Sequence, residues 1–172
     1  MKKAELPKNE AERLKAVHSL HILDTKPEER FNKITNEAAK KLEVPISAIS
    51  IIDEEREWYK SCHGLDTTEG PRDISFCGHT LTHEEDILVV EDTLEDERFR
   101  DNPYVLGDPF VRFYAGVKLF DKKNKMPIGV FCVKDKSPRS LKMDDLSTIL
   151  EYAQRAQEEI NKANSQTNST QS

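Results

Sequence analysis

The chain lacks any long hydrophobic run. Among its 172 residues, no apolar stretch approaches the roughly 20 residues that a membrane-spanning helix requires. The opening segment Met-Lys-Lys-Ala-Glu-Leu is not followed by an apolar signal segment. We therefore expect a cytoplasmic protein that has no membrane partner.

Cysteine is scarce, and there is no excess of basic charge. Three cysteines, an odd number for a reducing compartment, argue against a disulfide framework. The 26 Lys and Arg residues face 32 Asp and Glu residues, and the resulting net charge of −6 makes nucleic acid a poor partner for this surface. With 36% hydrophobic residues, the length suits one domain with a sizeable core.

Apolar periodicity predicts helices at both ends of the chain. A first amphipathic helix is expected over 9–23, and a second should follow Pro27 and end near Leu42. The final helix, from about Lys142, carries an apolar stripe at alternating steps of three and four: Leu146, Ile149, Ala153, Ala156 and Ile160. That spacing fits a coiled-coil seam and fits equally well a helix packed on its own sheet.

Between these helices the pattern changes to short strands. Runs rich in β-branched and aromatic residues predict strands over 46–52, 58–62, 87–90, 113–120 and 128–134, with a turn at 54–57 between the first two. A short helix is expected over 76–83. The long acidic loop 91–109, which Pro103 and Pro109 break, is expected to hold one helical turn at 94–99. The predicted organisation is an N-terminal lead (1–8), one domain (9–162) and a disordered polar tail (163–172).

The most reactive residue types lie together in the middle of the chain. Cys77 and His79 follow Ser75 and Phe76, so a helix that begins there places the thiol in its first turn. A helix N-terminus or an imidazole can stabilise a thiolate. However, free cysteine is among the most buried residue types, and residues two apart on a helix do not face each other. A structural role for both residues is therefore the favoured interpretation.

Seven short motifs occur in one order along the chain. They are Glu12-Arg13-Leu14, Leu23-Asp24-Thr25-Lys26-Pro27-Glu28-Glu29-Arg30-Phe31, Ile51-Ile52-Asp53, Ser75-Phe76-Cys77-Gly78-His79, Arg98-Phe99-Arg100-Asp101-Asn102-Pro103, Arg112-Phe113-Tyr114-Ala115-Gly116 and Ile128-Gly129-Val130-Phe131-Cys132-Val133. Together they resemble the GAF sensory domains attached to bacterial histidine kinases and diguanylate cyclases, over roughly residues 9–162.

The resemblance implies a fold of the α+β class. It implies a central antiparallel sheet of about five to six strands, with helices packed on one face and a pocket layer of loops and a short helix on the other. It also implies a homodimer through the terminal helices that passes a signal to an output domain. No output domain is found in this sequence, so we expect that the domain acts alone, works through a partner signalling protein, or is a fragment of a multidomain sensor.

The specialised branches of this family fit the chain poorly. The free methionine-(R)-sulfoxide reductases carry a catalytic cysteine between the third strand and the last hairpin, where residues 91–112 contain none. The bilin photoreceptors attach their chromophore just ahead of the strand at 113–119, again without a matching thiol here. A zinc site would have to draw on Cys62, His63, Cys77, His79 and His83, which lack the usual ligand spacing. We expect no metal, no cofactor and no catalysis.

What remains is a binding role. An arginine ahead of an apolar strand needs a partner if its side chain points inward. For Arg112 that partner is Asp92, Asp96 or the carboxylate or phosphate of a ligand, and the alternative to ligand binding is a structural Arg–Asp pair that closes the loop 92–110. Tyr114 and Phe76 are candidates for an apolar pocket wall. The candidate ligand-binding residues are Phe76, Cys77, His79, Asp92, Arg112 and Tyr114. The alternatives left open are a thiol-based redox enzyme or sensor using Cys77, and a dimerisation scaffold with a vestigial pocket.

Overall fold

Six antiparallel strands form one sheet whose two faces are covered differently. The computed structural model describes residues 1–171, and side chains through residue 162. The strand order is β3-β2-β1-β6-β5-β4. The strands are β1 (Ile46–Ile52), β2 (Arg56–His63), β3 (Glu69–Pro71), β4 (Ile87–Val90), β5 (Phe113–Phe120) and β6 (Pro127–Asp135).

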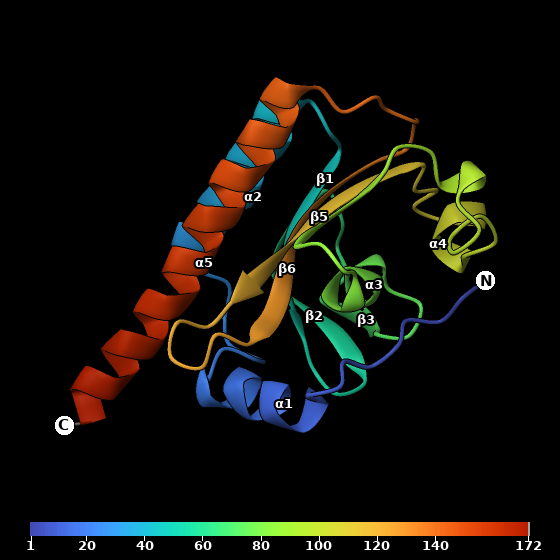
Figure 1. Cartoon of the computed structure of the whole chain (residues 1–172). Coiled ribbons are helices and arrows are strands. Elements are labelled where there is room, and N and C mark those ends of the chain that lie inside the picture. The colour runs from blue at the N-terminus through green and yellow to red at the C-terminus, as the bar shows by residue number, and fades with distance from the viewer. Residues whose placement is uncertain (172) are drawn as a thin grey trace.

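The helices are divided between the two faces of the sheet. They are α1 (Glu10–Ser19), α2 (Glu29–Leu42), α3 (Phe76–Thr82), α4 (Pro103–Leu106) and α5 (Met143–Gln171), with a 3₁₀ turn η1 (Thr93–Glu95). Figure 1 shows α2 and α5 side by side on one face, α3 and α4 on the other, and α1 below the sheet. The predicted α+β class, strand number and unequal covering of the sheet are confirmed.

Alternation along the strands builds a separate core on each face. In β6, Phe131 and Val133 belong to the core beneath α2 and α5, which we call the helix face. Val130 and Cys132 belong to the core beneath α3, which we call the pocket face. All seven residues of β1 are buried, as expected for a strand in the middle of such a sheet.

A β-bulge interrupts this alternation in β2. Ile49 pairs with Ser61, but the next residue, Ser50, pairs with Tyr59, which leaves Lys60 as the additional residue. Lys60 and Ser61 both point to the helix face, where the Ser61 hydroxyl contacts that of Thr35 at 2.8 Å. The bulge thus presents two successive polar side chains to the same layer.

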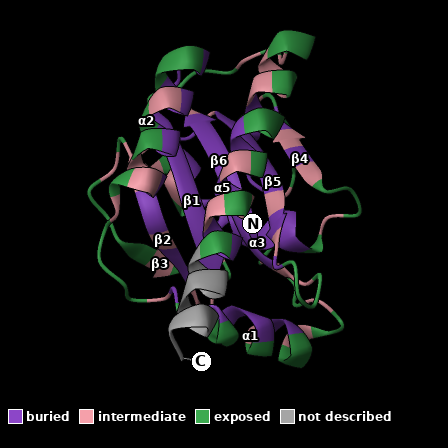
Figure 2. Cartoon of the chain, turned by 90° about the vertical axis from the view of Figure 1, so that its left-hand side faces the viewer, coloured by how far each residue is buried: buried purple, intermediate pink, exposed green. Residues whose placement is uncertain are grey.

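The apolar stripe of α5 packs on the chain's own domain. Ile149, Ala153, Ala156 and Ile160 are all at most 3% exposed and belong to the helix-face core. Figure 2 shows α5 in front of the sheet, with mainly exposed and half-buried residues on the side that faces outward. Of the two interpretations of this stripe, the structure shows packing on the parent sheet. None of the described helices is long and apolar enough to cross a membrane.

Several boundaries differ from those predicted. The first helix ends at Ser19 rather than 23, because His21 and Asp24 adopt positive φ values of 52° and 62°. The turn expected over 94–99 is the shorter η1. Helix α4 was not predicted, although Asn102 caps it by accepting a hydrogen bond from the Tyr104 backbone N–H at 2.9 Å. The tail predicted for 163–172 lies outside the residues described in full.

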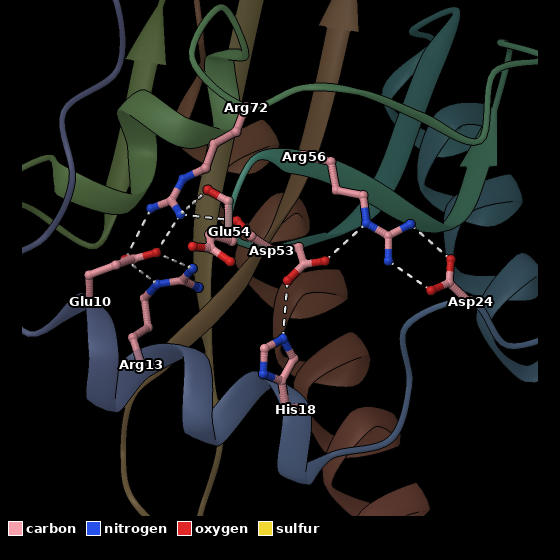
Figure 3. Close-up of polar contacts among 8 residues, drawn as sticks. All are labelled: Glu10, Arg13, His18, Asp24, Asp53, Glu54, Arg56 and Arg72. Atoms are coloured by element: carbon pink, nitrogen blue, oxygen red, sulfur yellow. Dashed lines mark hydrogen bonds and ion pairs between the residues drawn. The ribbon is translucent and has the colours of Figure 1, made fainter.

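A cluster of charged residues fixes α1 to the end of the sheet (Figure 3). The Glu10 carboxylate accepts hydrogen bonds from the guanidinium groups of Arg13 and Arg72, which are 0% and 4% exposed. Arg72 also donates to the Asp53 carbonyl at 3.0 Å, at the turn between β1 and β2. Partial burial raises the pKa of Glu10, but its bonds to Arg13 and Arg72 outweigh this effect and lower the pKa to about 2.

Candidate functional site

A cavity of about 450 Å³ opens on the pocket face. Its walls are formed by β2, β3, the loop between them, the first turn of α3, α4 with the loop that follows, and the end of β6. The region lies on the side of the sheet occupied by α3 and α4 in Figure 1. This volume falls within the range typical of small-molecule pockets.

Lys134 supplies a cation at the cavity wall. It follows Cys132 by two positions in β6, so that alternation brings its side chain to the pocket face, where it is 5% exposed. The ammonium lies 5.6 Å from the centre of the Phe76 ring and makes no ion pair or hydrogen bond within residues 1–162. Burial opposes its charge, but Cys132 and then Glu57 raise the pKa of Lys134 above its ordinary value.

Glu57 supplies a carboxylate to the same cavity. Its strand position, opposite Ile52 of β1 and Gly70 of β3, turns it to the pocket face, where it is 3% exposed. One carboxylate oxygen, Oε1, accepts a hydrogen bond from the Tyr59 hydroxyl at 2.8 Å. The other, Oε2, is buried and has no hydrogen-bond partner among the described residues. A buried acceptor without a donor is costly, and in a native protein it points to a missing partner.

Stacked aromatic rings form the apolar floor beneath α3. The Phe76 ring stacks on Phe99 at 4.6 Å and on Tyr114 at 5.1 Å between ring centres. The Tyr114 hydroxyl contacts that of Thr80 at 2.6 Å and donates to the Cys77 sulfur at 3.3 Å. Such a packed and hydrogen-bonded layer holds the cavity wall in a fixed position.

Comparison with known proteins places this arrangement in a family. The GAF domain family matches residues 26–160, which is most of the chain. The chain belongs to the GAF domain family. The match begins after α1, so the cavity, the pocket-face core and α5 up to Ile160 lie within the family's region. Glu10 and Arg13 lie ahead of it, as do the helix-face core residues of α1 and its following turn, Ala16, Val17, Leu20 and Ile22.

Relatives and solved structures agree with this assignment. A cyclic di-GMP phosphodiesterase from Pseudomonas aeruginosa is 38% identical over 133 residues, covering 77% of this chain but only about a fifth (22%) of that protein's length. The GAF domain of an Acinetobacter phosphoenolpyruvate-protein phosphotransferase superposes with a TM-score of 0.64 at 17% identity, covering 95% and 99% of the two chains. A free methionine-R-sulfoxide reductase from Neisseria meningitidis, solved with its substrate, gives 0.61 at 16% identity and covers 91% and 90%. Both superpositions show the fold alone.

The structure separates the residues expected to bind a ligand in this GAF domain. Only Phe76 lines the cavity. Cys77 and Tyr114 are fully buried beneath it, between α3 and the sheet. Asp92 and Arg112 form an ion pair at 3.1 Å outside the cavity wall, and Asp92 also caps η1. That pair matches the alternative in which it closes the loop 92–110.

His79 is held by the N-terminal segment and not by the cavity. Its Nε2 donates to the Lys2 carbonyl at 2.9 Å, and its ring meets the edge of Phe99 at 4.8 Å. Burial is the main cause that lowers the pKa of His79 below its ordinary value. The ring is therefore a neutral structural donor near neutral pH.

The three cysteines are free, and they lie on the pocket face in or beside its core. Burial raises the pKa of Cys77 well above its ordinary value and that of Cys62 to about 12. The Cys77 hydrogen bond lowers the pKa of the adjacent Cys132, which is 0% exposed. Within the described part of the chain, no three His, Cys, Asp or Glu side chains are grouped to hold a metal ion.

The two buried charged residues of the cavity, Glu57 and Lys134, were not among those predicted from the sequence. For Lys134 the sequence held a signal: a lysine two positions after Cys132, and so on the same face, in a strand that is otherwise almost wholly apolar. For Glu57 the signal was weaker, because the expected strand began only at Trp58 and the glutamate was assigned to the preceding turn. The two residues are 77 positions apart in the sequence, and this separation hid their common location.

Proposed function

We propose that this GAF domain is a cytoplasmic sensory or regulatory module that binds a small molecule in the 450 Å³ cavity and catalyses no reaction itself. The observation that carries the proposal is the buried Lys134 ammonium, which faces the cavity without any protein partner among the described residues. An isolated buried charge is unfavourable unless something compensates it. A bound ligand would supply that compensation.

The family supports a sensory role. GAF domains are typically sensory or regulatory modules, and the Pseudomonas relative carries its matching segment within a much longer phosphodiesterase. By that analogy, binding in the cavity would be reported to a partner signalling protein. The ligand and the output both belong to the proposal.

Two other functions have less support. A thiol-based redox enzyme or sensor using Cys77 would need an accessible thiolate, whereas this thiol is fully buried and burial raises its pKa. A homodimer through the terminal helices would have to use another surface than the apolar stripe of α5, because that stripe is already packed. Slow alkylation of Cys77 by iodoacetamide in the folded protein, at less than a tenth of the unfolded rate, would argue against the thiol function.

Native mass spectrometry tests the binding function directly. The purified protein is incubated with a protein-free small-molecule extract, desalted, and its native mass is compared with its denatured mass. We expect an added mass that is lost on denaturation. The Thr67→Trp variant, which fills the cavity mouth from an exposed position, should lose this added mass, and Thr82→Trp at the end of α3 should keep it. A bare native mass in the wild-type protein would contradict the proposal.

A further inference from the structure

From the charges that line the cavity we infer the chemical class of its ligand. We propose that the cavity binds a zwitterionic amino carboxylate, such as a free α-amino acid with an apolar side chain. In this arrangement Lys134 receives the ligand's carboxylate and Glu57 its ammonium group. This inference rests on the proposed binding function and specifies it further.

The first argument is that two opposite charges share the cavity without meeting. Lys134 and Glu57 are 5% and 3% exposed, and no ion pair joins them or joins either of them to another described residue. The Glu57 Oε2 atom in addition lacks any donor. A ligand with one anionic and one cationic group satisfies both residues at once, whereas a purely anionic ligand leaves Oε2 unpaired.

The second argument is the charge of the rim. Three exposed carboxylates, those of Asp66, Glu69 and Asp108, line the cavity against one exposed ammonium, that of Lys136. Glu69 is paired with Arg56 at 3.4 Å, so Asp66 and Asp108 carry most of the negative charge of the rim. Acidic groups at an entrance repel multiply charged anions and attract ammonium groups. The rim therefore disfavours phosphate esters such as nucleotides, but not a zwitterion of zero net charge.

The third argument is the apolar part of the wall. Phe76 lies beneath the Lys134 ammonium, and Leu65 and Val111 line the same space from two loops. Aromatic and aliphatic groups beside one charged pair are the usual composition of a site for an amphipathic small molecule. The wall thus accommodates an aliphatic or aromatic side chain on the ligand.

Matched analogues on the wild-type protein test the ligand class without any mutation. The probes are L-leucine, L-methionine and L-phenylalanine, each with its N-acetyl form, which lacks the ammonium, and its amide, which lacks the carboxylate. Isothermal titration calorimetry should show saturable binding of at least one free amino acid. We expect each matching analogue to bind at least 10-fold more weakly. Equal binding of the analogues would overturn the inference.

Variants then locate the two charges. Lys134→Met and Glu57→Gln should each weaken binding of the amino acid at least 10-fold. The control variants Lys118→Met in β5 and Glu97→Gln on the surface should leave this binding unchanged. If guanosine monophosphate binds instead and Thr67→Trp abolishes that binding, the inference is wrong and the proposed function stands. If no probe binds and the native mass is bare, both are wrong.

Discussion

Two buried lysines, one on each face of the sheet, differ in whether their ammonium groups have hydrogen-bond and ion-pair partners. On the helix face, Lys60 is 3% exposed, and its ammonium reaches Thr25 Oγ1 at 2.8 Å, the Lys26 carbonyl at 2.7 Å and a Glu28 carboxylate oxygen at 2.7 Å. On the pocket face, Lys134 is 5% exposed and has no such contact among the described residues. Each ammonium lies over a phenylalanine ring, at 5.4 and 5.6 Å.

The difference teaches what each face is for. Burying an ammonium costs several kcal/mol. At Lys60 three oxygen partners in direct contact offset this cost, whereas Lys134 has only the electrostatic influence of Cys132 and Glu57 and no hydrogen bond or ion pair among the described residues. The helix face uses its buried charge to hold the connection between α1 and α2 on the sheet. The pocket face keeps a charge that has no contacting partner among the described residues, and the proposed ligand would supply that partner.

Removing the partnered lysine should have the largest effect. Lys60→Met leaves the oxygens of Thr25, Lys26 and Glu28 without their donor, and we expect the free energy of unfolding to fall by about 3 kcal/mol. Urea denaturation measures this loss, and Lys40→Met on the exposed side of α2 is the control. A loss below about 0.5 kcal/mol would break the contrast between the two faces.

Acid should reveal the paired charges of α1. The pKa of Glu10 is lowered from 4.5 to about 2, so this group stabilises the folded state above pH 4.5 and loses that contribution as the pH falls toward 2. We expect about 1 to 2 kcal/mol after allowing for solvent screening. The free energy of unfolding, measured by denaturation at a series of pH values, should depend less steeply on pH in Glu10→Gln than in the wild-type protein. Glu12→Gln, which changes an exposed residue of the same helix, should keep the wild-type dependence on pH.

A smaller loss is expected from the hydroxyl beneath the cavity. Tyr114→Phe removes the contacts to Thr80 and Cys77 and should cost about 1 kcal/mol, measured by thermal denaturation. The matched change on the helix face is Tyr152→Phe, whose hydroxyl reaches Glu37 only at 3.5 Å. An equal loss in both variants would show that the hydroxyl network under α3 adds no particular stability.

The smallest effect on stability is expected for Lys134→Met, although this substitution should strongly weaken ligand binding. In the ligand-free protein, Lys134→Met replaces an unpartnered cation with an apolar side chain of similar length. The free energy of unfolding should therefore remain unchanged or rise by up to about 1 kcal/mol. Urea denaturation of this variant and of Lys60→Met under the same conditions compares the two changes in the free energy of unfolding directly. A loss of about 3 kcal/mol would show that Lys134 has partners in the folded protein and would remove the main support for the ligand site.

The sequence predicted those parts of the fold that depend on neighbours in the chain. Runs rich in β-branched and aromatic residues located β1, β4, β5 and β6. Ser75 marked the start of α3, where its hydroxyl accepts from the Gly78 N–H at 2.9 Å. Helix α4 was missed because Pro103 was interpreted as a break, although proline after an Asn cap also begins a helix.

The candidate site was less predictable, because only the pairing of distant strands in the sheet brings its two buried charged residues to one cavity. Glu57 and Lys134 reach one cavity from β2 and β6, which are separated by β1. Chemical reactivity drew attention to Cys77 and His79, whose surroundings in the fold are structural. The clearest signal in the sequence was the position of Lys134, two residues after Cys132 in β6, which places both side chains on the same face of the sheet. That signal could be used only once the face holding the cavity was known.

The bulge in β2 has a consequence for insertions and deletions in related chains. Deleting its additional residue, Lys60, would leave the pairing of β2 with β1 in register on both sides, with Tyr59 and Glu57 still on the pocket face. Deleting a residue anywhere from 57 to 59 would instead turn the preceding part of the strand over and carry Arg56 or Glu57 to the opposite layer. Single-residue gaps among homologues should therefore collect at position 60.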